Sequence, residues 1–191
     1  PDPSQVREVG RIQGPAQQGG FHNIFAYKHS DGRNLLLATI SEPAAHVYDL
    51  DKFLAGDPDF GLVGRVPNPA PEQTRGYHDY YVGYHPESGQ DRFYGAGGGG
   101  FYVYDITDLD SPNFLTSVTN VSGIRSGHTL TPTPDGRYAV GETEYRTAPL
   151  RIFDLQPGLD GEVPTISRPI GAWTANWKNF SHNHEVRWPY V

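Results

Sequence analysis

The sequence contains no cysteine and no methionine. Without cysteine there is no disulfide, no zinc site with Cys ligands and no thiol nucleophile. No apolar run approaches the 18 residues of a membrane-crossing helix, so we expect no membrane span. Basic clusters are also missing and the net charge is −7, which argues against nucleic acid as a partner. Because methionine is absent and the chain starts "PDPSQ", we expect a mature or cleaved product of a longer chain.

Glycine, proline and tyrosine are plentiful, with 23, 17 and 12 residues respectively. Helix formers do not occur in long periodic windows, whereas short apolar and aromatic runs separated by turn formers are common. This composition favours an all-β fold. The length of 191 residues suits a single domain.

A repeat of about 50 residues occurs three times, at residues 21–50, 77–106 and 127–155. Each copy opens on a histidine and closes on an aromatic residue, an aspartate and Leu or Ile. The histidine and the aspartate are 27, 27 and 26 residues apart, in the pairs His22–Asp49, His78–Asp105 and His128–Asp154. His182 continues the series, so successive histidines are spaced by 56, 50 and 54 residues.

Within each copy the sequence predicts four short strands, with an Asp-Gly or Ser-Gly turn between the first two. Four strands in a unit of this length are typical of a β-propeller blade. The expected strands are residues 23–27, 35–40, 46–50 and 61–66, then 79–84, 92–96, 101–106 and 114–118, then 129–133, 138–142, 150–155 and 169–173.

The predicted architecture is a β-propeller fragment of about three four-stranded blades plus flanking strands of two more, spanning residues 1–191. The preceding blade would end in residues 1–20, because "REVGRI" resembles "GLVGRV", and the next would begin in residues 181–191. Propellers typically close with four to eight blades, so the expected partner is the remainder of the same propeller or a second fragment or chain. The three full blades are residues 21–70, 77–120 and 127–175.

Three segments, "HVYDLDKF", "FYVYDITDLDSPNFLTSV" and "RIFDLQPG", resemble the LVIVD repeat, in which a branched apolar strand ends in Asp and continues through a proline turn. The openings "HN", "HD" and "SHN" also resemble bacterial choice-of-anchor proteins built from such repeats. The resemblance implies an exported, periplasmic or extracellular β-propeller that serves as a binding or scaffold module. It implies no particular chemistry, because propellers carry many functions.

The histidine series leaves three interpretations open. The histidines could be structural, as in WD-repeat propellers, although the aspartate needed between the second and third strands is missing here. Alternatively, since the first strand of each blade lines the channel, they could converge on the axis and bind Cu, Fe or Zn. The third interpretation is a metal-free ligand pocket at one mouth. The candidate metal ligands are His22, His78, His128, His182 and His184.

The segment "NHEVRWP" weakly resembles selenium-binding proteins of the methanethiol oxidase type, which are propellers with metal-bound histidines. This resemblance implies an alternative function, a His-ligated, metal-dependent enzyme of oxidase type. No Ser-His-Asp order or nucleophile elbow is visible, so the sequence leaves open whether the chain is an enzyme.

The remaining polar residues invite simpler interpretations. Asp79 would point away from His78, on the opposite strand face, and so would be a poor partner for it. The glycine run at residues 95–100 predicts a close backbone approach, since no helix follows that could form a phosphate loop. We expect surface or loop positions for His29, His46 and His85. Asp49, Asp105 and Asp154 are expected to cap turns. Glu142 and Glu144 are expected at exposed positions on one strand.

Overall fold

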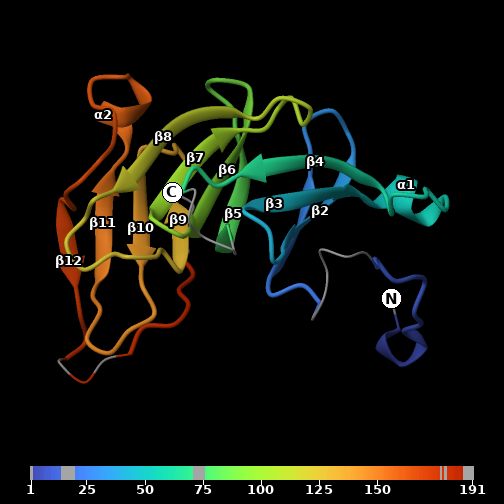
Figure 1. Ribbon diagram of the computed structural model, residues 1–191, viewed down its shortest axis with the longest axis horizontal. Helices are drawn as coiled ribbons and strands as arrows, with labels where there is room; N and C mark the ends of the chain where they lie inside the picture. The colour runs from blue at the N-terminus through green and yellow to red at the C-terminus, as the bar shows by residue number, and fades with distance from the viewer. Residues whose placement is uncertain (1, 14–19, 71–75, 177, 179, 187–191) are drawn as a thin grey trace.

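The computed structural model describes residues 2–13, 20–70, 76–176, 178 and 180–186. In these residues twelve strands form three four-stranded antiparallel sheets, which stand side by side (Figure 1). Each sheet uses four consecutive strands in chain order, so each is a simple meander. The prediction of an all-β fold with three four-stranded units is confirmed, and no sheet formed by the described residues closes on itself.

All twelve expected strands are present, close to their predicted positions. The first sheet contains β1 (Ile24–Lys28), β2 (Asn34–Thr39), β3 (Ala44–Asp49) and β4 (Leu62–Pro67). The second contains β5 (Tyr77–His85), β6 (Gln90–Gly97), β7 (Gly100–Asp105) and β8 (Asn113–Thr119). The third contains β9 (Thr129–Pro132), β10 (Tyr138–Glu142), β11 (Leu150–Asp154) and β12 (Gly171–Trp173).

The turn between the first and second strands of each sheet contains a glycine with positive φ. The φ angles of Gly32, Gly89 and Gly136 are 96°, 68° and 66°. Residues with a Cβ adopt this backbone region only at a cost, so glycine is the natural choice at these three turns. The Asp-Gly and Ser-Gly signals therefore mark the hairpins correctly.

The glycine run brings backbones close together, as the sequence predicts. A Cβ on Gly97 would stand 2.1 Å from the carbonyl oxygen of Gly76, and a Cβ on Gly100 would stand 2.3 Å from that of Val118. Both distances are far below van der Waals contact. A larger residue at position 97 would push β6 away from Gly76, and one at position 100 would push β7 away from β8.

Short helices, which were not predicted, follow the third strand of the first and third sheets. They are α1 (Leu50–Leu54) and α2 (Gln156–Leu159), and a 3₁₀ helix, η1 (Pro3–Gln5), lies near the N-terminus. Asp49 caps α1 by accepting hydrogen bonds from the backbone N–H of Asp51 and Lys52. Asp105 and Asp154 accept from backbone N–H groups two residues ahead, so the turn-cap prediction is confirmed for all three aspartates. In the part of the chain that is described, no helix has the length and apolar character to cross a membrane.

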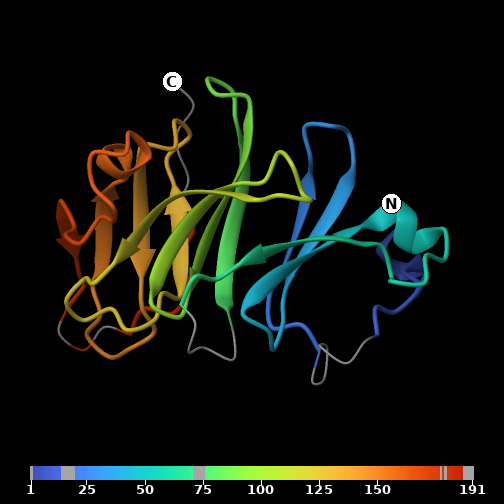
Figure 2. The ribbon, with the colours of Figure 1, turned by 45° about the horizontal axis from the view of Figure 1, so that its top comes forward.

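Two apolar cores lie between neighbouring sheets. Leu37 and Val47 of the first sheet pack with Phe93 of the second, and Phe101 of the second packs with Phe153 of the third. The Phe101 and Phe153 ring centroids are 6.0 Å apart. Fully burying one such side chain is worth about 1.5–3 kcal/mol, so these contacts hold the sheets together. β5 lies between β1 and β9, the first strands of the sheets on either side (Figure 2).

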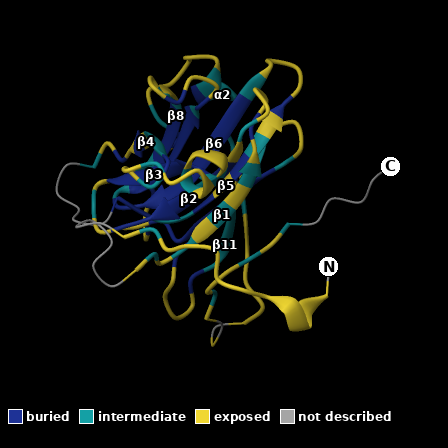
Figure 3. Cartoon of the chain, turned by 90° about the vertical axis from the view of Figure 1, so that its right-hand side faces the viewer, coloured by how far each residue is buried: buried dark blue, intermediate teal, exposed yellow. Residues whose placement is uncertain are grey.

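The outer face of the third sheet is more exposed than the equivalent faces of the other two. Val47, Val103 and Ile152 each lie two residues before the aspartate that ends the third strand of their sheet. Val47 and Val103 are 1% exposed, whereas Ile152 is 38% exposed and Trp173 of β12 is 60% exposed. The surfaces between sheets are buried, while the N-terminal segment is exposed (Figure 3).

The flanking strands of two further blades stay predictions. Residues 7–12 form no strand here, and neither do residues 181–186. Residues 187–191, expected to continue the last strand, lie outside the described residues.

Candidate metal centre

Three of the four histidines of the series come from the same end of three neighbouring first strands. His22 lies shortly before β1, His78 lies at the start of β5 and His128 lies directly before β9. The pairing of β5 with β6 shifts register between Tyr77 and Asp79, so His78 sits in a β-bulge. Bulges re-aim a side chain relative to the strand, which is their frequent use next to functional sites.

The four imidazoles of the series form one row. The ring centroids of His22 and His78 are 4.3 Å apart, those of His78 and His128 are 3.9 Å apart, and those of His128 and His182 are 4.9 Å apart. The Nε2 atoms of His22 and His78 are 2.8 Å apart, so one ring donates a hydrogen bond to the other. The structure thus brings together histidines that are up to 160 positions apart in the sequence, from His22 to His182.

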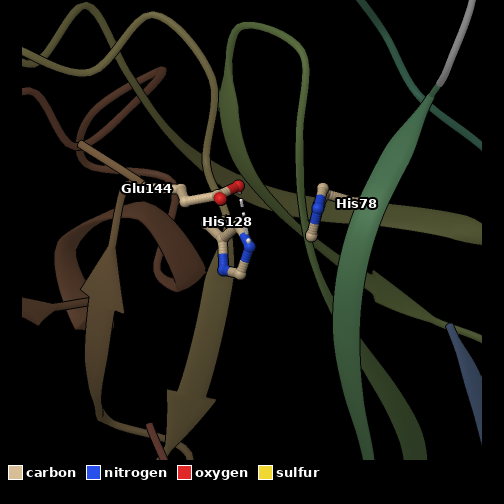
Figure 4. Close-up of side chains that lie close together, drawn as sticks. All are labelled: His78, His128 and Glu144. Atoms are coloured by element: carbon tan, nitrogen blue, oxygen red, sulfur yellow. Dashed lines mark ion pairs between the residues drawn. The ribbon is translucent and has the colours of Figure 1, made fainter. Parts of the chain in front are cut away.

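Glu144 adds a carboxylate to this row. It follows β10, and its carboxylate lies over the His128 ring, with His78 facing the same group from β5 (Figure 4). Its Oε2 is 3.4 Å from Nε2 of His128, and its Oε1 is 3.6 Å from Nε2 of His182. One donor atom each of His78, His128 and Glu144 lies within 4.8 Å of the others. Ligand atoms on one ion, at about 2 Å each, stand roughly 3 to 4 Å apart, so the three side chains would have to move closer together to share an ion.

Glu142 lies behind the row and is fully buried, with 0% exposure. Its Oε1 is 3.5 Å from Nδ1 of His128 and 3.9 Å from Nδ1 of His184. Neither oxygen accepts a well-formed hydrogen bond from a described residue. Burial acts to raise the pKa of Glu142, but the two imidazoles outweigh it and the net shift is downward. The carboxylate is therefore ionised at neutral pH.

Of the prediction of exposed strand carboxylates, the exposure is confirmed for Glu144, which lies after β10 and not in a strand, and is wrong for Glu142, which lies in β10 but is buried. His184 contacts β10, because its Nε2 donates to the backbone carbonyl of Val140 over 3.1 Å. His184 thus lies against Glu142 and Val140, on the far side of the row. Its role as a ligand stays a prediction.

The nitrogen of His128 that faces away from Glu144 has its own partners. Its Nδ1 is 3.1 Å from Oγ1 of Thr129, and this hydroxyl donates to Oδ2 of Asp79 over 3.2 Å. Asp79 therefore interacts, through Thr129, with the histidine of the next sheet. This connection to the next sheet was not predicted from the sequence, in which Asp79 stands directly after His78.

The other three histidines are all buried. The prediction of surface or loop positions is wrong for His46 and His85, which lie in β3 and β5, whereas His29 does lie in a loop, after β1, but not at the surface. His29 Nε2 lies 3.1 Å from the carbonyl oxygen of Ile106, and His85 Nε2 lies 2.9 Å from that of Asp135. In both cases the acceptor belongs to the following sheet, which covers the ring. His29 and His85 each lie seven residues after a histidine of the series, a regularity that could have revealed them as equivalent.

The buried Asp91 was not singled out from the sequence. It accepts hydrogen bonds from the Tyr27 hydroxyl and from the backbone N–H of Ser30, and its Oδ2 is 3.2 Å from Nε2 of His29. Burial and the hydrogen bond to Asp91 strongly raise the pKa of Tyr27, which keeps the phenol neutral. This network joins the first and second sheets at the end opposite to the histidine row, where the first hairpin turn lies.

Imidazole nitrogens and carboxylate oxygens form a donor set that suits zinc, copper and iron. The residues that could hold such an ion here are His78, His128 and Glu144, with His22 and His182 at the two ends of the row. Comparison of the chain with protein-family models gives no match, and comparison with curated proteins gives none either.

Proposed function

We propose that this chain is part of a β-propeller whose repeated histidines hold one transition-metal ion at the axis. The observation that carries the proposal is the row of four imidazoles, each from a separate repeat, with Glu144 beside it. The buried histidines His29 and His85 bond backbone carbonyls of the following sheet, whereas the rings of the row contact one another. A shared ligand between the rings accounts for that arrangement.

The arrangement of the sheets supports a propeller. All three have the same strand order, and their first strands lie next to one another, as in blades around a channel (Figure 1). Apolar cores fill the two spaces between neighbouring sheets. Since a propeller needs at least four blades, further sheets would complete the ring.

The charges around the row favour a divalent cation. Glu142 and Glu144 contribute two negative charges next to imidazoles, and Glu142 has no access to water. A buried carboxylate without hydrogen-bond donors is costly, and a nearby cation offsets this cost. A metal ion between His78, His128 and Glu144 would neutralise both carboxylates.

A redox-active ion would make the same site catalytic, which is the second candidate function. Two histidines and one carboxylate are the ligand set of many non-haem iron sites, and additional imidazoles suit copper. His22 and His182 are exposed, so a small molecule can reach both ends of the row. An oxidase-like activity would follow if the bound ion is iron or copper, and a structural or ligand-binding role if it is zinc.

The uncovered face of the third sheet supports a further blade as partner. Ile152 and Trp173 occupy positions whose counterparts in the other sheets are covered by the next sheet, and they are exposed here. We include in the proposal an exported, LVIVD-like binding or scaffold module as the wider role. Partner blades would come from the same chain or from another one.

Metal analysis tests the central claim. The purified protein is stripped with a chelator, dialysed and titrated with Zn²⁺, Cu²⁺ and Fe²⁺ under calorimetry, with elemental analysis of the recovered complex. We expect about one ion per chain, and a loss of affinity of at least tenfold in the variants His78→Ala and Glu144→Gln. Glu162→Gln, an exposed carboxylate outside the cluster, is the control and should bind like the wild type. Unchanged binding by His78→Ala would refute the site.

A further inference from the structure

The two ring nitrogens of His128 face different surroundings. Nε2 points toward Glu144, whose Oε2 is 3.4 Å away, on the side of the ring where His78 lies. Nδ1 points toward Thr129 and Glu142, on the buried side. A neutral imidazole carries its proton on one nitrogen only, and the other nitrogen is then free to bind a metal.

The hydrogen bonds of Thr129 show which nitrogen carries the proton. A hydroxyl has one hydrogen to donate, and Thr129 donates it to the carboxylate of Asp79, which can only accept. Toward His128, over 3.1 Å, the same hydroxyl must therefore act as the acceptor. The proton between them belongs to Nδ1 of His128.

Glu142 reinforces this assignment from a second direction. Its Oε1 is 3.5 Å from Nδ1 of His128, and the side chain is fully buried. A negative charge held at that distance, out of contact with water, favours a proton on the nitrogen that faces it, and it does so more strongly than the Glu144 carboxylate at Nε2, which is 41% exposed and screened by water. Nδ1 thus faces one carboxylate directly, that of Glu142, and is linked to a second, that of Asp79, through the Thr129 hydroxyl.

We propose that Thr129 and Glu142 are positioning residues, which keep the proton of His128 on Nδ1 and leave Nε2 as the donor atom toward Glu144 and His78. Metal-binding histidines usually donate their second N–H to a carboxylate or another acceptor, and this fixes the ring and raises its basicity. The consequence for metal affinity rests on the proposed function. The position of the proton does not, since it follows from the metal-free geometry.

The test measures the proton and the metal separately. Ring ¹⁵N chemical shifts from long-range ¹H–¹⁵N spectra report which nitrogen of His128 is protonated in metal-free protein at about pH 8, above the ordinary histidine pKa. Zn²⁺ calorimetry on the same samples gives the affinity. The variants are Thr129→Val, which keeps the side-chain shape, Glu142→Gln, which keeps the size but removes the charge, and the two combined. Thr143→Val is the matched control, because its buried hydroxyl makes no hydrogen bond to a described residue.

We expect protonated Nδ1 and unprotonated Nε2 in the wild type and in Thr143→Val. Thr129→Val and the double variant should shift part of the population to the other tautomer and lower the Zn²⁺ affinity by roughly 10- to 100-fold, the usual effect of removing an outer partner of a metal ligand. Protonated Nε2 in the wild type, or an unchanged tautomer in every variant, would overturn the proposal. A wild type that keeps protonated Nδ1 but binds no metal supports the positioning role and refutes the proposed function.

Discussion

The candidate ligands come from two sheets, so a bound ion would link the second sheet to the third. His78 belongs to β5, whereas His128 and Glu144 flank β9 and β10. In the unfolded chain these residues are separated by long segments and form no site. An ion that binds only the folded state raises the free energy of unfolding. We therefore expect Zn²⁺ to stabilise the protein against heat.

The size of the effect follows from ligand linkage. At a free Zn²⁺ concentration about 100 times the dissociation constant, the free energy of unfolding rises by about 2.7 kcal/mol. For a chain of 191 residues, each kcal/mol shifts the midpoint temperature by about 2–4 °C. The expected increase in Tm is therefore about 5–11 °C.

The assay is thermal unfolding followed by circular dichroism, in chelator and over a Zn²⁺ series that brackets the dissociation constant. Tm should rise with the logarithm of the Zn²⁺ concentration above that constant. His78→Ala should abolish most of the shift, because His128 and Glu144, the other two residues of the cluster, both flank strands of the third sheet. Glu162→Gln should behave like the wild type. A shift of equal size in His78→Ala would show that the stabilising ion binds elsewhere and would refute the reasoning.

Three further predictions concern the scaffold. Phe153→Ala should lower the free energy of unfolding by about 3–5 kcal/mol in chemical denaturation, because the buried ring packs against Phe101 and leaves a cavity. Gly97→Ala should cost about 1–3 kcal/mol or more in the same assay, since its Cβ would stand 2.1 Å from the backbone oxygen of Gly76; a neutral effect would contradict the close approach. Burial lowers the pKa of His46 in the folded protein, although Glu42 partly offsets this shift. As the pH falls below about 6.5, the imidazole is therefore protonated more readily in the unfolded state than in the folded state, and the free energy of unfolding drops. His46→Gln should flatten that part of the curve of stability against pH.

The strands could be predicted from the sequence because the same pattern of strand and turn residues occurs in three separate segments. Apolar and aromatic runs, separated by turn glycines such as Gly32 and Gly89, recur in the same order, so a weak signal in one copy is supported by the other two. The helices α1 and α2 were missed because they are five and four residues long. That is too short for a helical period to show in the sequence.

The site could be predicted only in part. The spacing of the histidines predicted their convergence, which the structure shows for His22, His78, His128 and His182. The burial of Glu142 and the link from Asp79 to Thr129 could not be predicted in this way, because each depends on a segment far away in the sequence. Spacing within a repeat gives the direction of a side chain but not what a neighbouring sheet places against it.

The meander within each sheet has a kinetic consequence. Because every sheet joins four consecutive strands, most of its hydrogen bonds are between residues close in sequence, and such local contacts form early in folding. Domains and repeats generally fold as units, starting from the N-terminal side during synthesis. The row of histidines, by contrast, draws on every repeat and can only assemble after the sheets have docked. Its formation would therefore be the last step of maturation, and the uptake of an ion would mark the completed molecule.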